Sequence, residues 1–125
     1  MNRSVNLRNI KWVCHHLHID KSKTIHPKLL NESLAHMKEK WYLMREVKKN
    51  YTTKSLYNRM YDTTATLVEQ GCTQMRTFID VDNIVGLDAL YCARDIKSFW
   101  KSQDVDLQIG TQLLEGLETP ESIQL

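Results

Sequence analysis

The chain has 125 residues, a formal net charge of +2, 42% hydrophobic and 26% charged residues. This composition is ordinary for one globular domain with a real core. No apolar run reaches the roughly 18 residues of a membrane span, and the first residues lack the hydrophobic region of a signal peptide. Cys14, Cys72 and Cys92 are an odd number without paired spacing, so we expect free thiols in a reducing cytoplasm.

The first predicted elements are a strand and a long helix. Residues 10–19 are rich in Trp, Val, Cys and Ile, which favours a short strand. His26-Pro27 predicts a helix start, because proline suits the first helical turn. One helix is predicted over 28–50, where apolar residues recur at spacings of four and three. Its inner stripe consists of Leu30, Leu34, Met37, Trp41 and Met44.

A second helix and a second strand follow. The helix is predicted over 55–70, and Gly71 stands where a left-handed C-terminal cap is needed. Residues 73–81 alternate and contain several β-branched side chains, which predicts a strand. Thr53 is a candidate N-cap of the helix.

The remaining pattern predicts a helix over 83–101, a strand over 105–109 and a helix opening at 119–121. Strands that alternate with helices of this length indicate parallel βα units. The sequence therefore predicts an α/β protein with a parallel sheet.

A His-x-His pair is the first candidate site. On a strand, residues two apart point to the same face, which places the imidazoles of His16 and His18 side by side. Zinc and iron accept imidazole nitrogens, so the pair could bind one divalent metal. Asp20 shares this face if the strand extends that far. A His-x-His pair alone is more often structural than metal-binding.

Polar side chains on the next strand form the second candidate. Arg76, Phe78, Asp80 and Asp82 share one face, and carboxylates at the carboxyl end of a parallel strand lie where α/β enzymes place their sites. A structural interpretation is equally open. Asp82 can cap the next helix, and Asp80 can pair with Arg76.

Gln108 is the third candidate, since it is polar within an otherwise apolar strand. It could bind a substrate amide, or it could lie on the polar side of a half-exposed strand.

The charges divide unevenly along the chain. Residues 1–60 carry 13 Lys and Arg against 4 Asp and Glu, and residues 61–125 carry 4 against 11. A basic half could attract an acidic partner or nucleic acid, although a solvated helix face is the more common explanation. The candidate docking residues are Lys38, Lys40, Arg45, Lys48 and Lys49.

Three segments together resemble a known family. Residues 16–21, His-Leu-His-Ile-Asp-Lys, resemble the H-[IL]-H-[LI]-D signature that opens the amidohydrolase barrel. Residues 71–82 resemble the GxxxxRTHVDVD run of cytosine deaminase-like amidohydrolases, and residues 106–109 resemble their DLQI strand. Three motifs in the right order, separated by helix-sized gaps, are far more specific than one. The resemblance extends over residues 11–121.

The resemblance implies the first half of a TIM-type (β/α)8 barrel, incomplete because a whole barrel needs about 250 residues. It implies that a divalent metal, zinc or iron, activates a water that attacks a C–N bond of a cyclic amidine or amide. His16 and His18 would be the first two metal ligands, and Asp80 would line the barrel beside them. Phe78 stands where the family often has His, and Leu114 replaces a substrate-contacting Gln.

We therefore expect residues 1–125 to form one partial barrel domain, truncated at its C-terminus and inactive alone. A second chain could supply the rest of the barrel. For the complete enzyme we expect a small-molecule substrate, with no membrane partner and no nucleic acid. The alternative is a small α/β binding module that docks an acidic partner or nucleic acid through its basic N-terminal half.

Overall fold

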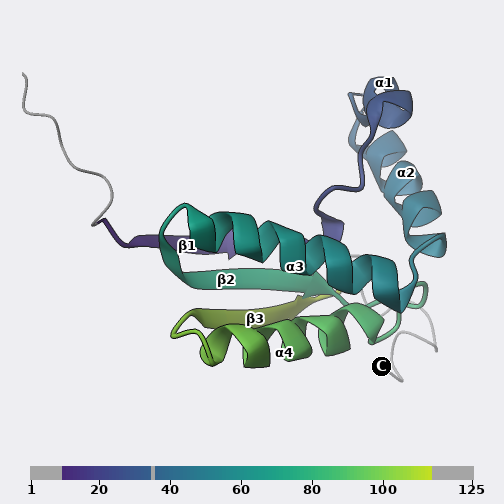
Figure 1. Cartoon of the computed structure of the whole chain (residues 1–125). Coiled ribbons are helices and arrows are strands. Elements are labelled where there is room, and N and C mark those ends of the chain that lie inside the picture. Colours follow the sequence, from purple (N-terminus) through teal and green to yellow (C-terminus); the bar gives the residue numbers. More distant parts are fainter. Residues whose placement is uncertain (1–9, 35, 114–125) are drawn as a thin grey trace, which may run out of the picture.

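The computed structural model of the chain describes residues 10–34 and 36–113 (Figure 1). Its strands β1 (Trp12–Leu17), β2 (Cys72–Asp80) and β3 (Asp106–Gln112) form one sheet in the order β1-β2-β3, and both pairings are parallel. The prediction of a parallel α/β arrangement is confirmed.

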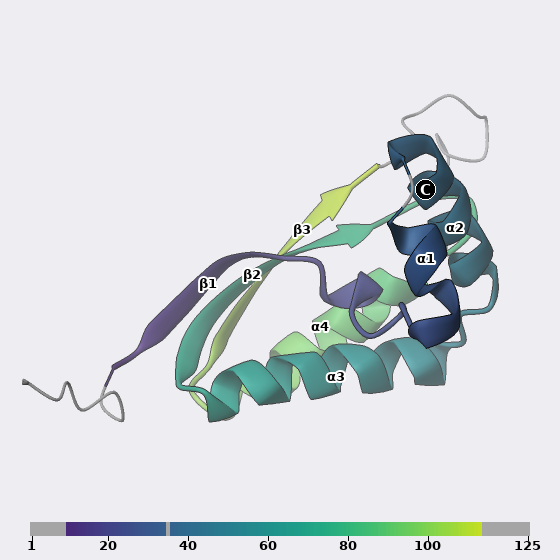
Figure 2. The ribbon, with the colours of Figure 1, turned by 90° about the horizontal axis from the view of Figure 1, so that it is seen from above.

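Two long helices cover one face of the sheet. Helices α3 (Thr53–Glu69) and α4 (Asp88–Lys101) lie side by side under the strands (Figure 2). Alternate strand residues face these helices because a strand turns successive side chains to opposite faces. The buried apolar side chains from the sheet and both helices include Met75, Ile79, Leu107, Leu56, Met60, Ala93 and Ile96. Burying each large side chain contributes about 1.5–3 kcal/mol relative to exposure.

The second helix, the second strand and the third strand begin and end within about three residues of the prediction. Gly71 has φ +94°, as a left-handed cap requires. The N-cap of α3 is Thr52 rather than Thr53, and Thr52 and Ser55 form a reciprocal capping box. Residues 83–87, expected to be helical, form a turn before α4.

The expected first half of a TIM-type barrel is wrong. The three strands form one small sheet, and the order of strands and helices is mixed rather than a regular βα repeat. One helix connects β2 to β3, whereas several helical segments separate β1 from β2. The extra segments arise because the chain does not continue from Pro27 as a single helix.

The predicted helix over 28–50 is also wrong, because three pieces replace it. A 3-10 turn (Pro27–Leu29) precedes α1 (Leu30–Ser33), and α2 (Met37–Lys49) begins after His36, whose backbone is extended. Helix α2 lies at the end of the sheet and not on its face (Figures 1 and 2). Most of the expected inner stripe is consequently exposed, with Trp41 56% accessible, and only Met44 is half-buried.

The predicted helix opening at 119–121 and Leu114 lie outside the described residues. Within the part of the chain that the structure describes, no helix is long and apolar enough to cross a membrane.

Candidate functional site

The rings of His16 and His18 converge at the end of β1. Their Nε2 atoms are 3.1 Å apart. The register of β1 against β2 shifts between Cys14 and Leu17. Because of this shift, Cys14 and Leu17 both pack toward the core although they are three residues apart. At a zinc–nitrogen distance of about 2.0–2.1 Å, nitrogens separated by this distance subtend about 100° at a shared metal, close to a tetrahedral angle. The distance fits either a hydrogen bond between the two rings or two ligands to one ion.

The backbone of β2 orients His18. Its Nδ1 lies 3.3 Å from the carbonyl oxygen of Phe78. A carbonyl only accepts, so the Nδ1–H donates and Nε2 carries the lone pair. A hydrogen bond of this kind fixes the tautomer that binds a metal. The Phe78 ring supports both imidazoles, with its centroid 5.1 Å from that of His16 and 6.2 Å from that of His18.

Asp80, at the end of β2, is the centre of a buried polar cluster. Its Oδ2 lies 2.7 Å from the Nζ of Lys48 on α2, and its Oδ1 accepts hydrogen bonds from Lys21 and Gln112. The Gln112 amide nitrogen is 2.6 Å from Asp80 Oδ1 and 3.4 Å from His18 Nδ1. Gln112 therefore donates to the carboxylate and lies beside the His18 ring, but it forms no hydrogen bond with Nδ1 while the Nδ1–H donates to Phe78.

The charge state of Asp80 follows from these contacts. Burial favours the neutral acid, but the hydrogen bonds from Lys21, Lys48 and Gln112 outweigh it and hold the pKa of Asp80 below its usual value. A carboxylate held in this way is a poor base. It is suited to orienting Gln112, whose amide nitrogen donates to it.

Lys48 and Asp82 complete the cluster. Lys48 is only 5% accessible, and its Nζ is 2.6 Å from Asp82 Oδ2. Burial lowers the pKa of Lys48, but the two aspartates outweigh this and raise it above the usual value. Burial likewise opposes ionisation of Asp82, yet Lys48 and the backbone N–H groups of Val85 and Ile84 lower its pKa.

The predicted capping of the next helix by Asp82 is wrong, because α4 begins at Asp88 and its N-cap is Leu87. Asp82 Oδ1 instead accepts hydrogen bonds from the N–H groups of Ile84 and Val85 in the turn before α4. The expected pairing of Asp80 with Arg76 is also wrong, because the Asp80 carboxylate forms ion pairs with Lys21 and Lys48 instead.

Asp20 does not continue the face of the histidine pair. Strand β1 ends at Leu17, and Asp20 is buried in a 3-10 turn (Ile19–Lys21). Its Oδ2 accepts the backbone N–H of Asp80, and its Oδ1 has no hydrogen-bond partner among the described residues. Burial, its largest influence, raises the pKa of Asp20.

Gln108 is exposed on the face of the sheet that α3 and α4 do not cover. Its Oε1 accepts from Nε and Nη2 of Arg76 at 3.0 and 2.8 Å. Both side chains line a cavity of about 100 Å³ beside β1. The proposed contact of Gln108 with substrate stays a prediction, and Gln112 is the glutamine that contacts Asp80 and His18.

Sequence reasoning missed Lys21, Lys48 and Gln112. The sequence predicts Lys48 to be an exposed docking residue. Its position nevertheless continues the spacing of Trp41 and Met44 along one side of α2. Gln112 lies four residues after Gln108, and alternation puts it on the same face of β3. Both spacings are present in the sequence, but no local pattern predicts that Lys21, Lys48 and Gln112 gather around one carboxylate.

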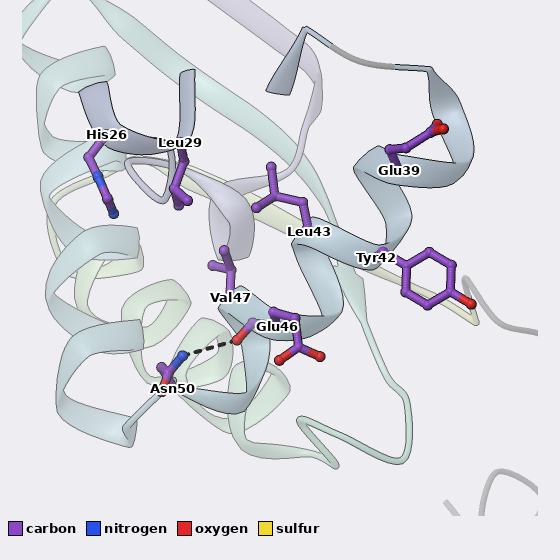
Figure 3. Close-up of a pocket in the computed structure, with 8 residues that line it drawn as sticks. All are labelled: His26, Leu29, Glu39, Tyr42, Leu43, Glu46, Val47 and Asn50. Carbon is purple, nitrogen blue, oxygen red and sulfur yellow. Dashed lines mark hydrogen bonds between the residues drawn. The ribbon is translucent and has the colours of Figure 1, made fainter. Parts of the chain in front are cut away.

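A second pocket lies elsewhere, between α2 and the segment before it (Figure 3). It measures about 760 Å³ and is mostly apolar. Asn50 closes one end and donates from Nδ2 to the carbonyl of Glu46 at 3.0 Å. The lining residues are His26, Leu29, Glu39, Tyr42, Leu43, Glu46, Val47 and Asn50. None of the predicted site residues contributes to this pocket.

Across residues 10–34 and 36–113, no three His, Cys, Asp or Glu side chains converge as a metal-binding group. A zinc site at His16 and His18 would need at least one further protein ligand, because catalytic zinc sites generally use three.

Comparison with known proteins adds one relative. No protein-family model matches the chain. The chain is 29% identical over 110 residues to an uncharacterized protein of Haemophilus influenzae. The match includes 87% of this chain but only 40% of that relative.

Proposed function

We propose that this chain contributes two ligands, His16 and His18, to a divalent metal site in a metal-dependent hydrolase that cleaves a C–N bond of a cyclic amidine or amide. The observation that carries the metal site is the 3.1 Å separation of the two Nε2 atoms. The choice of reaction rests on the resemblance of three segments to cytosine deaminase-like amidohydrolases.

A divalent metal bound by this pair would supply hydroxide near neutral pH by lowering the pKa of a bound water. The residues of this chain would do the positioning. Phe78 holds the tautomer of His18 through its carbonyl oxygen, and Asp80 holds Gln112 beside the ring. The Phe78 ring packs against both imidazoles.

The chain alone would be inactive, because it supplies too few ligands. The remaining ligands and the groups that bind the small-molecule substrate would come from other residues or from a second chain. The relative is consistent with this, since this chain spans about 40% of its length. A cytoplasmic location is part of the proposal, supported by the three free cysteines.

Cobalt(II) titration of the purified chain tests the metal site, because cobalt replaces zinc and absorbs visible light when it is bound tetrahedrally. We expect saturable binding that is lost in His16→Ala and His18→Ala. His15→Ala is the matched control, since His15 lies between the ligands and makes no contact with them in the described structure. Equal binding by all three variants would refute the assignment.

The basic docking module has less support. Lys48, one of its five candidate residues, is buried between two aspartates and is not available to a partner. Lys49 forms an exposed ion pair with Glu46 on its own helix.

A further inference from the structure

The pocket between α2 and the segment before it has an apolar floor (Figure 3). Leu43 and Val47 of α2 face Leu29 of the 3-10 turn, and all three side chains are half-buried. The lining residues of α2 recur at spacings of three and four, so they share one face of the helix. The volume of about 760 Å³ lies within the range of small-molecule sites. The floor is therefore large enough to bury the apolar body of a small molecule.

The rim of this pocket is acidic. Glu39 and Glu46 lie seven residues apart on the same face of α2, and both are exposed. Among the described residues, neither Lys nor Arg lines the pocket. The surrounding sequence has the opposite charge, because residues 1–60 carry 13 Lys and Arg against 4 Asp and Glu. Two of these four acids are on the rim, so the local charge favours a cationic ligand.

Tyr42 lies between the two rim carboxylates. It follows Glu39 by three residues and precedes Glu46 by four, which makes the three side chains neighbours on the helix surface. Tyr42 is 72% exposed, and the face of an aromatic ring attracts a cation, as a carboxylate does. Glu46 already pairs with Lys49, whereas Glu39 forms no ion pair within the described residues. Glu39 is therefore the carboxylate that is available to a ligand.

We propose that this pocket binds a small organic cation, an alkyl or aryl ammonium compound with an apolar body. The apolar body packs on the floor formed by Leu29, Leu43 and Val47, and the ammonium group lies beside Glu39 and the Tyr42 ring. A neutral molecule of the same shape would gain only the apolar contact, and an anion would be repelled by the rim. The pocket shares no residue with the candidate metal site, so this proposal does not depend on the proposed function.

Three probes of similar shape test the charge requirement: phenylbutylamine, phenylbutanol and phenylbutyrate. Each is titrated into the isotope-labelled chain at neutral pH, and the backbone amide chemical shifts report where it binds. We expect the amine to shift the amides of Leu43 and Val47 saturably, with a dissociation constant about tenfold below that of the alcohol. The butyrate should bind most weakly. Added salt should reduce the difference between amine and alcohol, because exposed charges are screened.

Two charge variants separate the rim from the rest of the surface. Glu39→Gln should weaken amine binding about fivefold, the scale of an exposed ion pair, and leave alcohol binding unchanged. Glu69→Gln is the matched control, because Glu69 is exposed at the end of α3 and lies outside the pocket. Leu43→Ala should weaken the amine and the alcohol alike. Unchanged alcohol binding by Glu39→Gln also shows that this variant is folded.

Several results would overturn the proposal. They are equal affinities for amine and alcohol, equal effects of Glu39→Gln and Glu69→Gln, shifts confined to other parts of the chain, and no saturable binding of any probe. Shifts of Leu43 and Val47 with protein concentration alone would also overturn it, because a second copy of the chain would then occupy the pocket. The metal proposal is tested separately, since a His16→Ala/His18→Ala chain should bind the amine with unchanged affinity.

Discussion

Lys48 and Asp80 form a buried ion pair, with Nζ 2.7 Å from Oδ2, that joins α2 to the end of β2. The two residues are far apart in the sequence and lie on different elements. Asp82 shares the same ammonium group, so one lysine neutralises two buried carboxylates. This contact holds α2 across the carboxyl ends of the strands, beside the histidine pair.

Replacing Lys48 should be costly. Lys48→Met leaves Asp80 and Asp82 buried without their shared cation, and breaking a buried pair from one side costs about 3–5 kcal/mol. Lys49→Met is the control, because the Lys49–Glu46 pair is exposed and such pairs contribute at most about 1 kcal/mol. Urea unfolding of both variants measures the difference. Similar losses in the two would mean that the buried pair is not stabilising.

Stability should decrease in acid. The folded-state pKa values of Asp80 and Asp82 are lowered from 3.8, so the stability they contribute is present above that pH and is lost as the pH falls through the folded values. Asp20 acts in the opposite direction, because burial raises its folded-state pKa, so the folded state takes up this proton before the unfolded state as the pH falls. Urea unfolding between pH 5 and pH 2 should show the decrease, and Asp80→Asn should reduce its slope.

Gly110 leaves room for the Phe78 ring. A Cβ at this position would lie 2.9 Å from Phe78 Cδ1, so Gly110→Ala must displace the ring that supports His16 and His18. We expect cobalt affinity to fall by about tenfold, or about 1.4 kcal/mol. The double variant Gly110→Ala/Phe78→Leu has a smaller side chain there and should recover part of the affinity. An unchanged affinity in Gly110→Ala would show that the ring does not position the pair.

A third imidazole should strengthen metal binding. Phe78 packs against both histidine rings, so Phe78→His places another nitrogen donor next to the existing pair. Three protein ligands are typical of catalytic zinc sites, and we expect zinc affinity to rise at least tenfold by calorimetry. Phe78→Leu, which adds no donor, should give no increase. A rise in the leucine variant would attribute the effect to packing.

Most of the local elements of this protein could be predicted from its sequence. Period-two and period-3.6 patterns located β2, β3 and α3, and Gly71 marked the end of α3 because few other residues adopt its positive φ. The closeness of His16 and His18 was predicted from strand alternation, although β1 ends at Leu17 and a register shift precedes the pair. These features depend on neighbours within a few residues, which is why they can be predicted.

The packing of distant segments against one another could be learned only from the tertiary structure. The open three-stranded sheet, the breaks before α2 and the burial of Lys48 all contradict the sequence-based expectation, because each depends on segments distant in the chain. An isolated lysine favours solvent, and burying its charge is favourable only when carboxylates are already in place. Asp80 and Asp82 are in place because β2 delivers them to the end of the sheet, and helical spacing could not show that α2 would meet them there.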